Sequence, residues 1–456
     1  MKLNIRAAVA ALTIIATALG ANAQSRSAYF TDGYLFGHQL NPSFANNRNY
    51  VSIPGIGNLN MAAMGTIGVK HMIFNVDGRT TTLLNPAVSV AEVMNGLKNN
   101  NRLGIDARIG VLSFGFNGMG GYNTFAVNVR ADAHIRMPKA LFSLIKEGIS
   151  NRTYDISNLG ARADAYAEIA LGHSRVLPFD KRWRVGAKLK FLVGAGAFDA
   201  KLDKADLTLG TDSWHAITNA RINASIKGFS YNTDYSETTH RDYVSGAELD
   251  SPGIGGFGFA VDLGATFRLN KDWCFSAALS DLGFISWSNN VEASTNGDRS
   301  VVTSDYLFNA DKDADNSFKN EWRRLRDGLS ELYQLTDNGD LGSRTRALGA
   351  TLALAAEYHL PVYRPLSFGL LSTTRIMGAY TWTEARLSAN YNRGAFCIGA
   401  NGALGTYGFS FGWIANVNVP GFNLYLGMDH TLGKLAKQGV PLSSNASLSF
   451  GFNIPF

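Results

Sequence analysis

Apolar and polar side chains alternate strictly along residues 446–456. The even positions are all apolar, and the odd positions from 447 to 453 are small or polar. The apolar set is Ala446, Leu448, Phe450, Phe452, Ile454 and Phe456, and between them lie Ser447, Ser449, Gly451 and Asn453. Successive side chains of a β-strand point to opposite faces, so the pattern predicts a strand with one apolar and one polar face.

The same two-residue period returns upstream with charges on the polar face. It is clearest at 125–135, 184–191, 257–268 and 381–390. Segments of about ten residues with this alternation are typical of membrane barrels, which are polar inside and apolar outside. We therefore predict an all-β fold, a transmembrane up-and-down antiparallel β-barrel of about fourteen strands, within a range of about 12 to 16.

The expected strands follow the alternation along the chain. They lie at 103–116, 121–136, 160–176, 183–199, 201–209, 214–230, 255–269, 273–287, 344–359, 366–377, 379–391, 395–404, 406–418 and 421–430, with 444–456 as a fifteenth candidate. Bacterial barrels usually have an even number of strands. Either one early segment does not span the wall, or residues 65–77 form another strand.

Short turns and long insertions alternate between the expected strands. The turns are at 178–181, 270–272, 361–365, 392–394 and 419–421, and the polar insertions are at about 231–253 and 288–343. In an up-and-down barrel the turns share the periplasmic side and the insertions face outward. Three segments, 86–98, 138–148 and 318–335, are expected to be helical. The last has an amphipathic spacing and is expected either to cap the outer mouth or to bind a partner.

The first residues resemble a cleavable export signal. Lys2 and Arg6 precede an apolar stretch at 7–19, and small residues end at Ala23. This stretch is shorter than the roughly 20 residues that a membrane-spanning helix needs. We expect residues 1–23 to be removed and 24–456 to form the barrel in the outer membrane of a Gram-negative cell.

Composition agrees with a wall that faces lipid. Aromatic residues make up 11% of the chain and charged residues 17%, below the roughly 25% of typical soluble domains. The net charge of +6 is spread without long basic runs, which gives no reason to expect nucleic acid as a partner. Cys274 and Cys397 both fall on the expected inner face, as two buried thiols or as a bridge.

Charged side chains in the expected strands should line the barrel interior, because Arg or Lys at the lipid midplane costs about 2 to 4 kcal/mol. This set is Arg108, Arg130, Asp132, Arg136, Arg162, Asp164, Glu168, Arg184, Lys188, Lys190, Asp262, Arg268, Glu384 and Arg386. Both signs are present, so the charges can pair with one another, pair with a plug, or line a path for a solute. Such an interior is less suited to a purely apolar ligand.

No pattern in the chain indicates catalysis or a cofactor. The glycines at 253–258 run into an alternating strand and do not open a helix, and the histidines, His134 among them, lack metal-ligand spacing. The acidic stretch at 311–315 lacks the Gly and Glu that a calcium loop needs, since Asn316 and Trp322 occupy those positions. We expect no enzyme activity, metal or cofactor.

Several stretches carry a resemblance to a known family. They are LNPSF at 40–44, IPGIGN at 53–58, SDLGFISW at 280–287, and FNLY at 422–425 with Asp429. With these stretches the chain resembles an uncharacterised outer-membrane barrel family of Bacteroidota, a domain of unknown function. It is more distantly similar to fatty-acid-transporter-like barrels and to accessory barrels of type IX secretion. That likeness implies fourteen strands and an N-terminal plug, which we assign to about 24–58.

These expectations lead to two hypotheses about function. The first is a monomeric barrel for passive transport of a small, hydrophobic solute, or a structural component of the membrane. The second is a scaffold whose outer insertions bind a protein partner in surface export or anchoring. Phe456 resembles the terminal signal read by the barrel assembly machinery, and it also completes the lipid-facing stripe. The expected partners are therefore outer-membrane lipid, that machinery, and a small solute or a surface protein.

Overall fold

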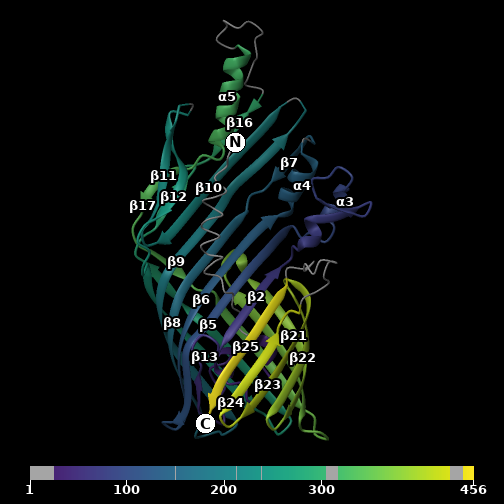
Figure 1. Cartoon of the computed structure of the whole chain (residues 1–456), viewed down its shortest axis with the longest axis vertical. Helices are drawn as coiled ribbons and strands as arrows, with labels where there is room; N and C mark the ends of the chain where they lie inside the picture. The colour runs from purple at the N-terminus through teal and green to yellow at the C-terminus, as the bar shows by residue number, and fades with distance from the viewer. Residues whose placement is uncertain (1–24, 149, 212, 238, 304–316, 432–444) are drawn as a thin grey trace.

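The wall is a ring of antiparallel strands (Figure 1). The computed structural model describes residues 25–456 except 149, 212, 238, 304–316 and 432–444. The long strands of the ring are β5 (Asn100–Gly118), β6 (Gly121–Pro138), β8 (Gly160–Val176), β9 (Trp183–Leu209), β13 (Gly256–Arg268), β14 (Trp273–Trp287), β19 (Ala350–His359), β20 (Leu366–Ile376), β21 (Trp382–Arg393), β22 (Phe396–Gly405), β23 (Gly408–Val419), β24 (Phe422–Met428) and β25 (Ala446–Pro455). Each pairs with the next, and β9 and β14 pair directly with β13 and β19.

An interrupted strand closes the ring between β25 and β5. Its two pieces, β1 (Tyr50–Ser52) and β2 (Leu59–Gly65), each pair with β25 on one side and with β5 on the other. The barrel is therefore closed and has fourteen strands, as the alternation predicted. The wall takes residues 50–52 from the stretch 24–58 that sequence analysis assigned to the interior.

Two of the expected strands do not belong to the ring, and of the two alternatives for an even strand number, the additional strand at 65–77 is not formed. Residues 201–209 are the upper part of β9, and the segment expected at 214–230 is β10 (Trp214–Ile226), which pairs with β9 above the ring. Residues 65–77 hold only the end of β2, the 3-10 turn η2 (Val69–His71) and β3 (Ile73–Val76). Apolar and polar residues alternate along any strand that stays paired with a neighbour, both in the membrane wall and in its extension. The alternation therefore does not distinguish the two. The true closing strand is broken at 53–58, so neither piece is long enough to show the pattern.

Side chains alternate across the wall as the sequence requires. Leu387, Leu404 and Phe409 are 64%, 66% and 72% exposed, whereas Arg386 and Asn401 from the opposite face of the same strands are buried. In a closed ring the buried face is the inside. The exposed face is the apolar one, which is the arrangement of a barrel whose outer surface meets lipid.

The wall continues at one end into an extension, at the top of Figure 1. It contains β7 (Arg152–Asp155), the hairpin β11 (Phe229–Ser236) and β12 (Arg241–Leu249), β15 (Val291–Ser294), β16 (Arg299–Val302), β17 (Thr336–Asp340) and β18 (Arg344–Ala347). The helix α5 (Phe318–Glu331) lies at its far tip and is shorter than the expected 318–335. The described parts of the two polar insertions are therefore largely structured.

A small lobe stands beside the extension. It holds β3, β4 (Arg79–Thr82), α3 (Val90–Met94) and α4 (Lys139–Glu147) around a core that includes Val88, Val93 and Phe142. The helix expected at 86–98 shrinks to α3, which begins after a capping box of Ser89 and Glu92 and ends before Gly96 at a φ of 78°. The helix expected at 138–148 is α4.

The short turns gather at the opposite end, at the bottom of Figure 1, together with the chain terminus. We call this the turn end. The expected turns at 178–181, 270–272, 361–365, 392–394 and 419–421 all lie there, between consecutive strands of the ring. No helix in the described ranges is long and apolar enough to cross a membrane.

Candidate functional site

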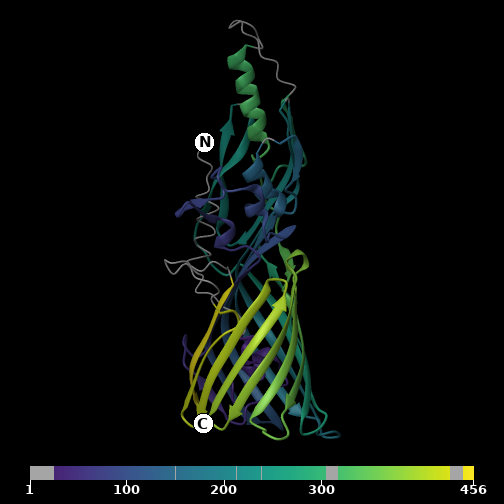
Figure 2. The ribbon, with the colours of Figure 1, turned by 90° about the vertical axis from the view of Figure 1, so that its right-hand side faces the viewer.

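The N-terminal segment, residues 25–49, lies against the inner face of the wall (Figure 2). It contains the 3-10 turn η1 (Arg26–Ala28) and the short helix α2 (Gly37–Leu40). Its aromatic side chains pack edge to face on wall tyrosines, with ring centroids 4.9 Å apart for Tyr34 and Tyr425 and 5.5 Å apart for Phe36 and Tyr50. Apolar packing accordingly accounts for part of its attachment.

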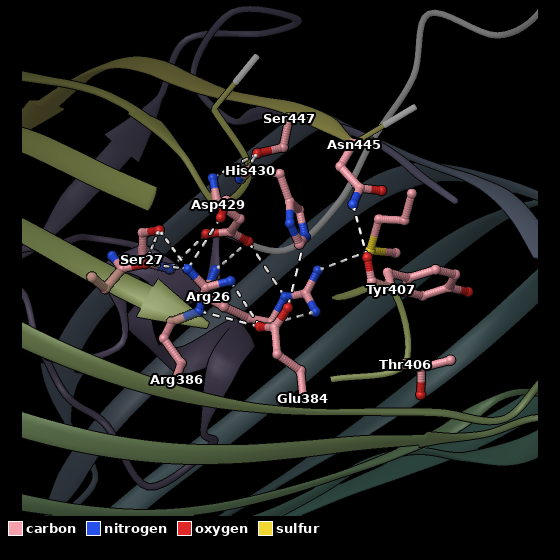
Figure 3. A network of polar contacts seen from close by, with 12 residues as sticks. Arg26, Ser27, Glu384, Arg386, Thr406, Tyr407, Asp429, His430, Asn445 and Ser447 are labelled. Atoms are coloured by element: carbon pink, nitrogen blue, oxygen red, sulfur yellow. Dashed lines mark hydrogen bonds and ion pairs between the residues drawn. The ribbon is translucent and has the colours of Figure 1, made fainter. Parts of the chain in front are cut away.

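Asp429, just after β24, binds the start of this segment (Figure 3). Its carboxylate accepts hydrogen bonds from the backbone N–H groups of Arg26 and Ser27, at 2.9 and 2.6 Å. It also accepts one from Nε of Arg26, at 3.3 Å. A carboxylate that accepts two backbone N–H bonds and a guanidinium bond fixes both the position and the direction of the chain.

Glu384 and Arg386 of β21 complete this Asp429 network (Figure 3). Arg386 donates to Glu384 at 2.7 Å and to the Asp429 carbonyl at 3.2 Å, and Glu384 lies 3.7 Å from Arg26. The Arg26 guanidinium stacks over the ring of Trp382, 4.6 Å from its centroid. Every charge here faces an opposite charge, which is what a buried ionic cluster requires.

His38 of α2 links the segment to the wall through a chain of hydrogen bonds. Lys188 lies 2.8 Å from its Nδ1, and its Nε2 lies 2.8 Å from the hydroxyl of Tyr50, which is 2.8 Å from Ser113 Oγ. Both ring nitrogens of His38 therefore have a hydrogen-bond partner on the wall. Burial, and then the nearby Lys188, hold the pKa of His38 well below its ordinary value, so the ring is neutral.

Asp281 is the centre of a second buried cluster, the Asp281 network. Its carboxylate binds Arg130 through two bonds of 2.7 and 3.0 Å and lies 2.6 Å from Lys190. Lys190 also meets Asp262 at 2.7 Å, and Arg130 meets Glu168 at 3.1 Å. Five consecutive strands of the wall, β6, β8, β9, β13 and β14, are thus joined on its inner face.

A bulge explains how Asp281 reaches this position. The register of β13 and β14 shifts between Val261 and Leu263, so an extra residue of β14 is unpaired there. Asp281 has a φ of 59°, and its N–H donates to Asp262 at 2.8 Å. Asp tolerates this left-handed conformation better than most residues. The SDLGFISW stretch therefore encodes a bulge that turns a carboxylate inward.

The structure brings most of the predicted interior charges into these networks. Buried on the inner face are Arg108, Arg130, Asp132, Asp164, Glu168, Lys188, Lys190, Asp262, Glu384 and Arg386. Arg136, Arg162 and Arg184 are partly exposed, and Arg268 is exposed near the turn end. His134 is buried, 3.9 Å from Asp106 and 3.7 Å from Asp132.

Other interior charges were missed by sequence reasoning. Arg375 meets Asp106 at 3.2 Å and Asp132 at 3.4 Å, and Arg346 meets Asp164 at 3.3 Å and Asp199 at 3.1 Å. Asp106 lies two residues before Arg108 in the same strand and therefore on the same face, so the alternation alone could have identified it. Arg346 lies in the strand expected at 344–359, but the structure divides that segment into β18 and β19, and the buried positions change from even numbers to odd numbers between them.

The Asn-Pro-Ser motif at 41–43 lies flat on the wall. A Cβ built on Gly186 would overlap the Pro42 carbonyl, and one built on Gly264 would overlap the Asn41 side chain. Ser43 is bonded to Thr266, Oγ to Oγ1, at 2.6 Å. The two glycines thus let the segment approach the strand backbones closely.

Two cavities lie beside these contacts. One of about 50 Å³ is lined by Arg26, Arg108 and Arg375 with Asp106 and Asp132 among others. The other, of about 280 Å³, lies at the turn end between Tyr29, Phe30 and Phe44 of the segment and Arg184 and Arg268 of the wall. The larger cavity therefore combines aromatic and cationic surfaces.

The two cysteines and the acidic residues provide no metal site within the described ranges. Cys274 and Cys397 are free thiols, so the bridge considered from the sequence is not formed. Among the described residues, no group of three or more His, Cys, Asp or Glu side chains could hold a metal ion. The acidic stretch at 311–315 and the export signal at 1–23 lie outside the described residues.

A family model matches residues 42–429, which cover the wall from the Asn-Pro-Ser motif to Asp429. The chain belongs to DUF5723, a family of unknown function. DUF5723 thus includes both the bulge stretch and the carboxylate that binds the N-terminal segment. No curated protein matches the chain.

The solved structures to which the chain is similar include hydrocarbon-channel barrels. The CymD monoaromatic hydrocarbon channel is 10% identical with a TM-score of 0.38, over 96% of this chain and 95% of that one. The toluene transporter TbuX of Ralstonia pickettii is 7% identical with a TM-score of 0.37, over 91% of each chain. The toluene transporter TodX of Pseudomonas putida is 8% identical with a TM-score of 0.36, over 95% and 94%. Such distant similarity identifies no solute for this DUF5723 chain.

Proposed function

We propose that this DUF5723 protein is an outer-membrane barrel for passive passage of a small, partly hydrophobic solute, with the N-terminal segment as its plug. The observation that carries the proposal is how the segment is attached. Asp429 and His38 hold it by hydrogen bonds and ion pairs, and no wall strand runs through residues 25–49. Only Asn49, next to β1, makes backbone–backbone hydrogen bonds to the wall within the described part of this segment, so the residues before it can move without opening the ring.

The lining of the larger cavity supports the choice of solute. Phe30 and Phe44 offer apolar surface, and Arg184 and Arg268 offer hydrogen-bond donors. A pocket of this kind suits a solute with an apolar body and a polar end. The charged networks farther along the interior make a purely apolar solute less suitable.

Single-channel recording in planar bilayers tests the proposal. We expect the wild-type barrel to show rare, short openings, and deletion of residues 25–47, which leaves β1 intact, to give a persistent conductance. Asp429→Asn should raise the open fraction several-fold, because it removes the charge that pairs with Arg26. Asp340→Asn is the matched control, since Asp340 caps backbone N–H groups in the extension. Complete impermeability of the deletion variant would refute passage of any solute.

We propose as the alternative a scaffold that binds a surface protein in export or anchoring. The observation in its favour is the structured extension, with the hairpin β11–β12 and the helix α5 at its tip (Figure 1). Replacing residues 229–249 by a short Gly-Ser linker should then abolish co-purification of a partner while leaving conductance unchanged. Unchanged co-purification would count against the scaffold.

A further inference from the structure

The outer face of the wall carries an apolar groove of about 590 Å³ across β9, β13 and β14. It is lined by the small side chains of Ala187, Ala265 and Ala277 and by the larger ones of Leu263 and Leu279 among others. The register places Leu263 between Ala187 and Leu279, and it places Ala265 opposite Ala277, so these last two small side chains are immediate neighbours across strands. The recess therefore follows from side-chain size.

The recess coincides with the place where the Asn-Pro-Ser motif packs on the inside. Gly186 and Gly264 have no Cβ on either face and also line the groove. The wall is thin at these two glycines because the Asn-Pro-Ser motif packs against them from inside the barrel. The outer hollow is therefore a fixed feature of the fold and does not depend on a mobile side chain.

Aromatic side chains mark the level of the groove. Next to it, toward the turn end, the rings of Trp183 and Phe267 have centroids 4.6 Å apart, and those of Trp273 and Tyr358 are 4.8 Å apart. Rings of this kind gather where a membrane wall meets the headgroups. The groove thus begins at the headgroup level of the turn end and rises into the apolar band.

Arg175 lies at the headgroup end of the groove. It is exposed on the outer face of β8, opposite Val185 in the register with β9, and it lines the groove together with His173. Within the described ranges, no carboxylate lies within ion-pair distance of Arg175. A cation facing lipid beside an apolar groove is complementary to a phosphate that carries acyl chains.

We propose that this groove retains one phospholipid of the leaflet at the turn end, with an acyl chain along the three alanines and the phosphate at Arg175. This inference rests on the proposal that the wall spans a membrane, but it is independent of whether the lumen conducts. The occupant is a glycerophospholipid and not lipopolysaccharide, because the turn end of an outer-membrane barrel is periplasmic.

Native mass spectrometry of the full-length barrel, released from detergent after extensive washing, tests the proposal. We expect one phospholipid mass on the wild-type protein. Ala265→Phe fills the groove and should lower the bound fraction about tenfold, through lost contacts of a few methylene groups. Arg175→Gln should lower it about fivefold, in line with about 1 kcal/mol for a cation near the headgroups.

Two control variants separate this site from ordinary lipid contact. Ala385→Phe makes the same change on an exposed, outward position of β21, and Arg393→Gln removes an exposed arginine at another turn. Both should retain lipid like the wild type. Equal retention by Ala265→Phe and Ala385→Phe, or a bound mass of lipopolysaccharide, would overturn the proposal. Single-channel recordings of the same variants test the proposed function separately, because loss of lipid binding in the groove leaves the conductance unchanged.

Discussion

Asp281 shows how a single residue organises the interior. Its carboxylate faces Arg130 and Lys190, and both of these cations are buried. If the carboxylate is removed, neither cation can reach water. Buried ion pairs add little over apolar packing, but breaking one leaves an uncompensated charge. Removing the Asp281 carboxylate therefore destabilises the barrel mainly through the buried charge that is left uncompensated, whereas the intact ion pairs add little stability over apolar packing.

Asp281→Asn should lower the stability of the barrel by about 3 kcal/mol, because it leaves two buried cations with one carboxylate fewer. Urea unfolding in lipid vesicles, followed by gel mobility without boiling, measures the shift of the midpoint. The control is Asp203→Asn, whose partners Lys201 and Arg221 are exposed, and it should change stability by no more than about 0.5 kcal/mol. Similar midpoints for both variants would contradict this role.

His38 should make the attachment of the N-terminal segment depend on pH. Its pKa is held low in place, whereas a released imidazole regains a pKa of about 6.5. Release therefore takes up a proton below about pH 6.5, so the attachment is at full strength above that pH and weakens as the pH falls.

Thiol labelling of Ala28→Cys, in a background in which Cys274 and Cys397 are alanine, measures this release. Ala28 is buried in η1, so labelling reports the segment leaving the wall. Because the thiolate is the form that reacts, each rate is divided by that of a free cysteine thiol at the same pH. We expect this ratio to be at least several-fold higher at pH 5 than at pH 7.5, and His38→Gln to remove the difference. A ratio independent of pH in the His38 protein would contradict the account.

At the scale of elements, the contact between the Asn-Pro-Ser motif and the wall depends on Gly186. Gly186→Ala should displace the segment, because the added methyl group overlaps the Pro42 carbonyl. The same labelling of Ala28→Cys should become about tenfold faster, which corresponds to about 1.4 kcal/mol. Gly402→Ala is the control, since its nearest contact is a Phe409 side-chain atom at 3.4 Å. Equal rates in the two variants would show that this contact does not hold the segment.

The strands that could be predicted from the sequence are those that face lipid on one side and the barrel interior on the other over ten residues or more. Strands β6 and β25 satisfy this condition and lie close to where alternation placed them. The closing strand could not be found, because β1 and β2 are short and separated by a turn at 53–58. The helix expected at 86–98 was too long, because apolar spacing does not register the glycine that ends it.

The interior networks were only partly predictable, for a related reason. Alternation tells which charges lie on one face of a strand, as it did for Arg130 and Lys190. Which charges meet depends on the register between distant strands, and Asp281 also depends on a bulge. The Asp429 network pairs residues 403 positions apart in sequence. No local pattern carries that information.

At the scale of the whole molecule, residue 456 lies beside the strand that closes the ring. Phe456 is exposed, and its backbone exchanges two hydrogen bonds with Asn49, at 2.9 and 3.1 Å. We propose that its side chain serves recognition by the barrel assembly machinery and adds little to packing. Phe456→Ala should lower the amount of folded barrel in the outer membrane several-fold without changing the midpoint of unfolding. Phe409→Ala, at another exposed phenylalanine, should leave that amount unchanged.

The central claim is that one face of the wall meets lipid while the other is enclosed. A scan of single spin labels along residues 446–454, in vesicles and with the two native cysteines replaced by alanine, tests it most directly. Collision with oxygen should be high at Leu448, Phe450 and Ile454 and low at Ser447, Ser449 and Asn453, with a period of two. A uniform profile, or access of a water-soluble nickel chelate to the even positions, would contradict the account.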